Sequence, residues 1–101
     1  MSEFIPVADV ASLPPGKGRT VHVRGREFAL WNLDGEFFCI DDRCPHRGGP
    51  LGSGHLEGGE VFCPLHGWGF DVRTGECATR PDKPVKTYPT RVREGQVEIA
   101  I

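Results

Sequence analysis

The hydrophobic positions along the chain favour short β-strands over helices. Residues 20–23 and 28–33 are rich in β-branched and aromatic side chains and stand on either side of Gly25. A third apolar run, residues 36–40, follows Asp34-Gly35. An Asp-Gly pair between two apolar runs is a strong signal for a β-hairpin. These runs therefore predict consecutive antiparallel strands.

The same pattern continues to the end of the chain. Val97, Ile99 and Ile101 alternate with Gln96, Glu98 and Ala100, which is the two-residue period of a strand. Further turns are predicted at residues 57–59, 74–75 and 94–95. One short helical turn is expected over residues 9–13, with Asp9 as its N-cap and Pro14-Pro15-Gly16 as its stop.

Length and composition narrow the fold class. The chain has 101 residues, which predicts one domain over residues 1–101. It contains 14 Gly and 9 Pro, which is high for a helical protein. The expected fold is all-β, a small antiparallel sandwich or barrel, with long loops at residues 43–57 and 63–70. Loops of that length on a small scaffold are usually functional.

Charge and hydropathy argue against a nucleic-acid-binding, membrane or secreted protein, and the cysteines indicate metal binding. The formal net charge is −2, from 12 basic and 14 acidic residues, so we expect no nucleic-acid partner. No apolar run has the roughly 20 residues of a membrane span, and no secretory signal opens the chain. A cytoplasmic location is therefore expected. In that reducing compartment, four cysteines are better explained by metal binding than by disulfides.

Two Gly- and Pro-rich segments each place one cysteine near one histidine. The first reads Cys-Pro-His-Arg-Gly-Gly-Pro-Leu from Cys44, and the second reads Cys-Pro-Leu-His-Gly-Trp-Gly-Phe from Cys63. Sixteen residues separate His46 from Cys63, enough for a strand to leave and return. Thiolate and imidazole are metal ligands, and backbone N–H groups in such turns can point at sulfur. The candidate ligands are Cys44, His46, Cys63 and His66.

This pattern resembles the signature of Rieske [2Fe–2S] domains, in which two Cys bind one iron and two His bind the other. The likeness extends to residues 70–76, 81–84, 84–89 and 94–97, and is sharpest over residues 43–76. It implies one [2Fe–2S] cluster per chain, bound by the four candidate ligands in loops at one tip of the fold. The residues that it places around the cluster are Arg47, Gly48, Leu65, Trp68, Phe70 and Pro81.

A structural zinc site is the alternative, because Zn²⁺ also accepts two Cys and two His. A C₂H₂ finger, however, pairs its cysteines in one loop and carries its histidines on a helix. Here each loop is mixed and no helix is expected around either histidine. The pattern therefore favours iron and sulfide over zinc.

The resemblance also predicts a low reduction potential. High-potential relatives carry a disulfide at the positions of Gly49 and Leu65, and hydroxyl donors to the cluster sulfurs at the positions of Trp68 and Phe70. Fewer hydrogen bonds stabilise the reduced, more negative cluster less. We therefore expect a midpoint around −150 mV, at the low end of the Rieske range.

The other candidate residues have simpler expected roles. Cys39 is expected to be a buried, inert thiol, and Cys77 to lie at a strand end. His22 and His55 are expected on the surface, and Trp68 is expected to shield the cluster from water. Arg43 and Arg47 are either a docking patch for an acidic partner or ordinary surface charges.

The resemblance leaves more than one function open. The first is a ferredoxin that carries one electron from a flavin reductase to a terminal oxygenase. The second is the small subunit of an assimilatory NAD(P)H-dependent nitrite reductase, passing electrons to a sirohaem protein. A zinc-binding interaction module is the third. The chain lacks a dinucleotide fingerprint and a second metal motif, so we expect no substrate turnover by this chain alone.

Overall fold

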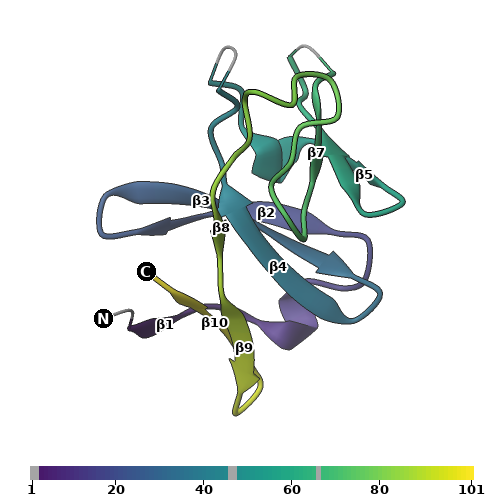
Figure 1. Ribbon diagram of the computed structural model, residues 1–101. Coiled ribbons are helices and arrows are strands. Elements are labelled where there is room, and N and C mark those ends of the chain that lie inside the picture. The colour runs from purple at the N-terminus through teal and green to yellow at the C-terminus, as the bar shows by residue number, and fades with distance from the viewer. Residues whose placement is uncertain (1–2, 46–47, 66) are drawn as a thin grey trace.

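The computed structural model describes residues 3–45, 48–65 and 67–101, which form three antiparallel sheets (Figure 1). The strand orders are β1-β10-β9, β2-β3-β4-β8 and β5-β6-β7. The strands are β1 (Phe4–Asp9), β2 (Gly18–Val23), β3 (Arg26–Leu33), β4 (Glu36–Asp41), β5 (His55–Glu57), β6 (Glu60–Phe62), β7 (Gly69–Asp71), β8 (Thr87–Tyr88), β9 (Thr90–Arg93) and β10 (Gln96–Ala100). Two short 3₁₀ turns are η1 (Val10–Ser12) and η2 (Leu51–Ser53).

Tight hairpins connect β3 to β4 and β9 to β10, as the sequence predicts. Asp34 and Gly35 have φ angles of 53° and 95°, and Glu94 and Gly95 have 52° and 77°. A two-residue turn with positive φ at both positions matches the right-handed twist of its strands, and glycine adopts that backbone without a Cβ penalty. The chain thereby reverses without losing strand register.

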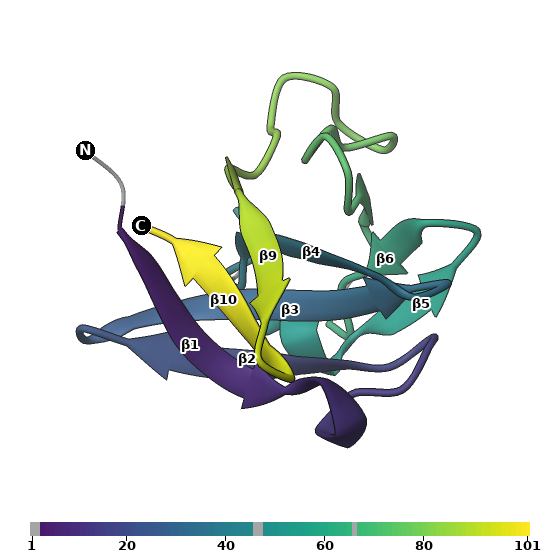
Figure 2. The same ribbon diagram turned by 90° about the horizontal axis from the view of Figure 1, so that it is seen from below.

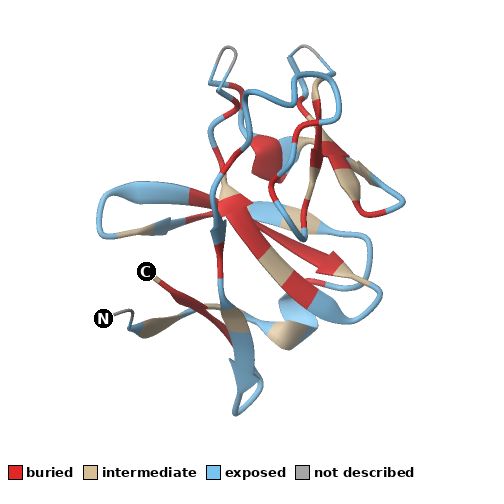
Figure 3. Cartoon of the chain, viewed as in Figure 1, coloured by how far each residue is buried: buried red, intermediate tan, exposed pale blue. Residues whose placement is uncertain are grey.

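β3 is buried on both of its faces, so the four-stranded sheet is the middle layer of the molecule. Phe28 and Leu30 are fully buried in one apolar core, whereas Ala29 and Trp31 are buried in the other. Figure 3 shows the buried residues along this sheet and on both sides of it. A strand covered on both sides needs a nearly continuous apolar sequence, which residues 28–31 supply.

The first core lies between the middle sheet and the sheet of β1, β10 and β9. Figure 2 shows β1 and β10 beside β2 and β3, and Val97 and Ile99 of β10 are fully buried there. Their alternation is confirmed, although the opposite face of β10 is also covered at Glu98 and Ala100. The guanidinium of Arg91 lies 2.5 Å from the Glu98 carboxylate, which pairs that partly buried charge.

The second core carries the candidate ligands. It joins the other face of the middle sheet to the sheet of β5, β6 and β7, and it contains Cys44, Cys63 and Phe70. The segment after β4 and the segment between β6 and β7 both reach the top of Figure 1, and both chain ends lie low in the same view. The all-β antiparallel fold with these two loops at one tip is therefore confirmed.

Three local predictions need correction. Residues 43–57 are not one loop, because η2 and β5 lie within them, and residues 63–70 run into β7. Asp9 precedes η1, but its side chain makes no capping bond; the Ser12 hydroxyl instead donates to the Asp9 carbonyl at 2.7 Å. Cys77 lies in no strand and forms only an isolated bridge with Phe70.

None of the helical turns in the described ranges has the length or apolarity of a membrane span.

Candidate metal centre

The two cysteine-bearing segments fold into the same turn. The Cys44 carbonyl accepts the Gly48 N–H at 2.7 Å, and the Cys63 carbonyl accepts the Gly67 N–H at 2.9 Å. Gly48 and Gly67 have φ angles of 73° and 75°, which a side chain rarely adopts. Each glycine stands four residues after its cysteine. The sequence thus builds the two halves of the site on one plan.

A second pair of hydrogen bonds closes each turn. The Cys44 N–H donates to the Gly49 carbonyl at 2.9 Å, and the Cys63 N–H donates to the Trp68 carbonyl at 2.8 Å. Each cysteine is therefore held by both its N–H and its C=O, so its backbone is fixed before any metal binds. Such fixed backbone is what a cluster with defined geometry needs.

The two turns meet at Gly49. A β-carbon built there would lie 2.7 Å from the Cys63 sulfur and 3.0 Å from Leu65 Cγ. Position 49 therefore lies against position 65, which agrees with the resemblance that makes these two the disulfide positions of other relatives. In this chain, the absence of a β-carbon at Gly49 leaves this approach to the sulfur open.

The two candidate sulfur ligands are buried, although a neighbouring apolar side chain is exposed. Cys44 and Cys63 are 1% and 3% exposed, whereas Leu65 is 58% exposed. Phe70 is fully buried in the same core, and Trp68 is half-buried against it. His46, Arg47 and His66 lie outside the described residues. The thiol groups thus lie in apolar surroundings, just beneath an exposed apolar side chain.

The segment between β7 and β8 folds beside the two turns, as Figure 1 shows. The Ala78 N–H donates to the Gly69 carbonyl at 3.1 Å, and the Gly69 N–H donates to the Thr79 hydroxyl at 3.3 Å. The Arg80 guanidinium lies 5.7 Å from the Trp68 ring centroid, a cation–π contact. This segment, residues 72–86, carries Pro81 and is called the covering loop.

Cys39 lies in the other core from the candidate centre, whereas Cys77 lies in the same core as Cys44 and Cys63. Both Cys39 and Cys77 are free thiols. The expectation that Cys39 is buried is confirmed. Burial, and then the nearby Asp41 carboxylate, raises the pKa of Cys39 to about 12. The Cys77 sulfur accepts the Arg80 N–H at 3.2 Å, so it helps to fix the covering loop.

The remaining histidines are on the surface, as expected. The His22 side chain is 70% exposed and lies 3.3 Å from Glu27 across the β2–β3 hairpin. The His55 side chain is 73% exposed and lies 3.4 Å from Glu57. The ion-pair partners of these two histidines are thus glutamates of their own hairpins. Within the described ranges, no three His, Cys, Asp or Glu side chains gather as a metal site.

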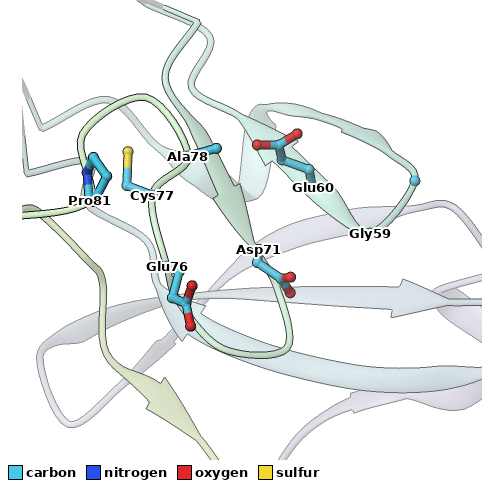
Figure 4. A pocket seen from close by; sticks show the side chains of 8 residues that line it. Gly59, Glu60, Asp71, Glu76, Cys77, Ala78 and Pro81 are labelled. Atoms are coloured by element: carbon cyan, nitrogen blue, oxygen red, sulfur yellow. The ribbon is translucent and has the colours of Figure 1, made fainter.

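A hollow on the flank of the covering loop holds acidic side chains. Figure 4 shows Glu60, Asp71 and Glu76 around it, with Cys77 and Pro81 at one side. Its carboxylates belong to β6, β7 and the turn that follows β7. We assign it no part in the centre.

The sequence does not single out Asp42, whose carboxylate accepts the Gly52 N–H and the Thr20 hydroxyl, both at 2.8 Å. Asp42 is 3% exposed. The available signal was position: an Asp at the end of an apolar strand, directly before a Gly-rich turn, commonly accepts backbone N–H bonds.

The residues present fit an iron–sulfur group. Two cysteine sulfurs lie in turns of one plan, a β-carbon at position 49 would fill the space beside one of them, and apolar side chains surround both. Thiolates in such a site are soft ligands that suit Fe–S clusters. The two thiols supply two of the four protein ligands of such a cluster.

Comparison with known proteins points the same way. A family model described as the Rieske [2Fe-2S] domain matches residues 3–89. The 3-phenylpropionate/cinnamic acid dioxygenase ferredoxin subunit of Photorhabdus laumondii subsp. laumondii is 41% identical over 97 residues, which covers 94% of this chain and 91% of that protein.

Two of the matching solved structures are covered over nearly their whole length. A complex of reduced oxygenase and oxidized ferredoxin in carbazole 1,9a-dioxygenase contains a chain with a TM-score of 0.88 and 31% identity, covering 96% of this chain and 92% of that one. A Mycobacterium tuberculosis chain described as an NADH-dependent nitrite reductase small subunit has a TM-score of 0.91 and 28% identity, covering 100% and 96%.

Proposed function

Because the chain belongs to the Rieske [2Fe–2S] domain family, we propose that it carries single electrons from a flavin reductase to a terminal oxygenase. The observation that carries this proposal is the pair of matched cysteine turns meeting at Gly49 at one tip of the fold. Its support from relatives is a dioxygenase ferredoxin subunit that is 41% identical over 94% of this chain.

The cofactor is a [2Fe–2S] cluster, which supplies a one-electron redox centre when bound. We propose one cluster per chain, with Cys44 and Cys63 on one iron and His46 and His66 on the other. The two histidines lie outside the described residues, so their assignment rests on spacing and on the family. One cluster site and one domain over residues 1–101 suit a carrier of one electron at a time.

Residues around this centre hold its cysteines in place, exclude water and offer a contact to a partner. The glycine turns hold each cysteine backbone by two hydrogen bonds, so that little must move when the charge on the site changes. Phe70, Trp68 and the covering loop exclude water from the sulfur side. The exposed Leu65 extends from the same turn and offers an apolar contact to a redox partner.

The function also defines what the chain does not do. We propose that it turns over no substrate and that its place is the cytoplasm, where flavin reductases and NAD(P)H are found. Two free, buried thiols at Cys39 and Cys77 suit a reducing compartment. We propose redox proteins as its partners, with no nucleic acid and no membrane among them.

A second function is favoured by one specific likeness. The chain described as a nitrite reductase small subunit matches this fold with a TM-score of 0.91 across the whole of it. In that role the electron acceptor would be a sirohaem protein. The two functions differ in the acceptor and share the same centre.

A reconstitution experiment separates them. The reductase and oxygenase of the 3-phenylpropionate/cinnamic acid dioxygenase system would be mixed with NADH and this chain in place of their own ferredoxin. We expect oxygenated product that depends on the chain, and none with a Cys63→Ser variant. Failure of the chain to support the oxygenase, together with support of nitrite reduction by a sirohaem subunit, would reverse the assignment.

A further inference from the structure

The two cysteine turns are closed at their bases in different ways. The turn that begins at Cys63 is the connection of a hairpin, and the ladder between β6 and β7 closes it with the pair Phe62 and Gly69. The turn that begins at Cys44 has no such ladder. Its flanking residues Arg43 and Pro50 form only an isolated bridge. Something else must hold the first turn.

Asp42 supplies that closure from both its backbone and its side chain. The Leu51 N–H donates to the Asp42 carbonyl at 2.6 Å, and the Gly52 N–H donates to Asp42 Oδ1 at 2.8 Å. The first turn therefore follows Asp42 in the chain and ends in two residues that are hydrogen-bonded to Asp42. Bonds from a backbone N–H to an ionised carboxylate are about twice as strong as neutral ones.

The same carboxylate ties the turn to the middle sheet. The hydroxyl of Thr20, on β2, donates to Asp42 Oδ1 at 2.8 Å. Gly52 also lies against β2, because a β-carbon there would come within 2.6 Å of the Thr20 backbone nitrogen. Asp42 Oδ1 thus links Gly52, at the end of the first turn, to β2 of the middle sheet.

The carboxylate of the neighbouring Asp41 bonds to a different part of the protein. Asp41 Oδ1 accepts the Tyr88 hydroxyl at 2.7 Å, and Asp41 Oδ2 accepts the Lys86 N–H at 3.2 Å. Asp41 is the last residue of β4 and Asp42 follows it, and the two carboxylates have different hydrogen-bond partners. Asp41 therefore anchors the end of the covering loop, whereas Asp42 anchors the end of the first cysteine turn.

We infer that Asp42 is a positioning residue for the redox centre: it fixes Cys44 relative to Cys63 by closing the first turn onto Thr20. Burial makes this role specific, because a carboxylate that is 3% exposed needs its hydrogen-bond partners to be well placed. The inference rests on the proposed function in one respect, that Cys44 and Cys63 hold the same cluster.

The test uses variants of the whole protein with its cluster bound. Asp42→Ala removes all side-chain bonds. Thr20→Val removes only the tie to β2. Asp42→Asn removes the charge but keeps an oxygen that can accept both bonds, so it is the conservative rescue. Val97→Ala, in the other core, is the control for lost stability alone.

We expect Asp42→Ala to change the EPR line shape of the reduced centre. It should also shorten the half-life of the cluster against an iron chelator by about tenfold or more, because two charge-assisted bonds are lost. Thr20→Val should show the same change in line shape at smaller amplitude. Asp42→Asn should keep the parent line shape, even where the lost charge moves the potential. Val97→Ala should keep it as well, despite a lower melting temperature.

Two results would overturn the inference. The first is a parent line shape and a parent cluster half-life in both Asp42→Ala and Thr20→Val. The second is that Val97→Ala changes the line shape as much as they do. If Asp42→Ala does not fold, Thr20→Val against Val97→Ala decides the same question. A parent protein that binds no iron would instead refute the proposed function, so the two failures are distinguishable.

Discussion

Gly49 lies so close to Cys63 that a β-carbon at position 49 would come within 2.7 Å of the cysteine sulfur. Real side chains essentially never make so short a contact, so the glycine defines how near the first turn can come to a ligand of the second. The backbone of the first turn at Gly49 therefore lies against the side chains of Cys63 and Leu65 in the second turn.

Gly49→Ala should consequently disturb the centre more than the fold. The added methyl group must displace the Cys63 sulfur or separate the two turns, and either change alters the geometry that the cluster requires. We expect iron and labile sulfide per chain to fall to less than about half of the parent content, a change worth roughly 1 kcal/mol or more in cluster binding. Chemical analysis of freshly purified protein measures this directly.

Gly58→Ala is a control for a methyl group added elsewhere in the chain. Gly58 has a positive φ of 60°, which Gly49 does not, and nothing lies within 4 Å of a β-carbon built there. The substitution therefore adds backbone strain of roughly 1 kcal/mol without any contact to sulfur. Equal loss of iron in both variants would show that general destabilisation, and not the approach to Cys63, controls the centre.

The buried Phe70 allows a test of how the protein sets the potential. We expect a parent midpoint of about −150 mV, because few hydroxyl donors compensate the charge of the reduced cluster. Phe70→Tyr adds a hydroxyl at a fully buried position in the core that contains both cysteines, and it should raise the midpoint. Protein-film voltammetry of the two proteins gives the shift.

Phe28→Tyr controls for a buried hydroxyl placed elsewhere. Phe28 is also fully buried, but it lies in the core on the other side of the middle sheet. Its substitution should lower stability and leave the midpoint unchanged. A parent midpoint above about +100 mV, in the upper half of the Rieske range, would contradict the hydrogen-bond account.

Cys39 makes the stability of the fold depend on alkaline pH. Burial raises the pKa of this thiol from an ordinary value of 9.0 to about 12. Between these values the unfolded chain loses the proton while the folded chain keeps it. The stabilisation from the neutral buried thiol is therefore complete below pH 9 and declines as the pH rises toward 12.

Denaturant unfolding at pH 7, 10 and 11 measures this dependence in parent and Cys39→Ala proteins. The parent should lose stability above pH 9 more steeply than the variant, by up to about 1.4 kcal/mol for each pH unit. Tyr88, whose pKa is raised to about 12 chiefly by burial and by its bond to Asp41, contributes to the decline in both proteins and cancels in the comparison. Parallel curves for the two proteins would show that the Cys39 thiol ionises normally.

Local chemistry accounts for what could be predicted from the sequence. The Asp34-Gly35 and Glu94-Gly95 turns follow from residues that tolerate positive φ, and the alternation around Val97 and Ile99 follows from one buried face. The ligand pattern was recognisable because each cysteine must be followed at a fixed distance by a glycine, Gly48 or Gly67, that closes the turn. All of these signals lie within a few residues of one another.

The features that escaped prediction depend on contacts between distant segments. Asp42 reaches Thr20 and Gly52, and no local pattern distinguishes it from the neighbouring Asp41. β5 and β7 fall within the loops that the sequence predicts, because strands of three residues carry almost no periodicity of their own. Their assignment comes from pairing with β6, which only the folded chain supplies.

The central claim is that a [2Fe–2S] cluster is bound here by two cysteines and two histidines. Pulsed EPR of the reduced protein tests it most directly, because it detects nitrogen nuclei bonded to the paramagnetic centre. The account predicts coupling to two histidine nitrogens, which changes when the protein is grown with ¹⁵N-histidine and is lost when His46 and His66 are replaced. A reduced centre without histidine nitrogen coupling, or a colourless protein that contains zinc in place of iron, would contradict it.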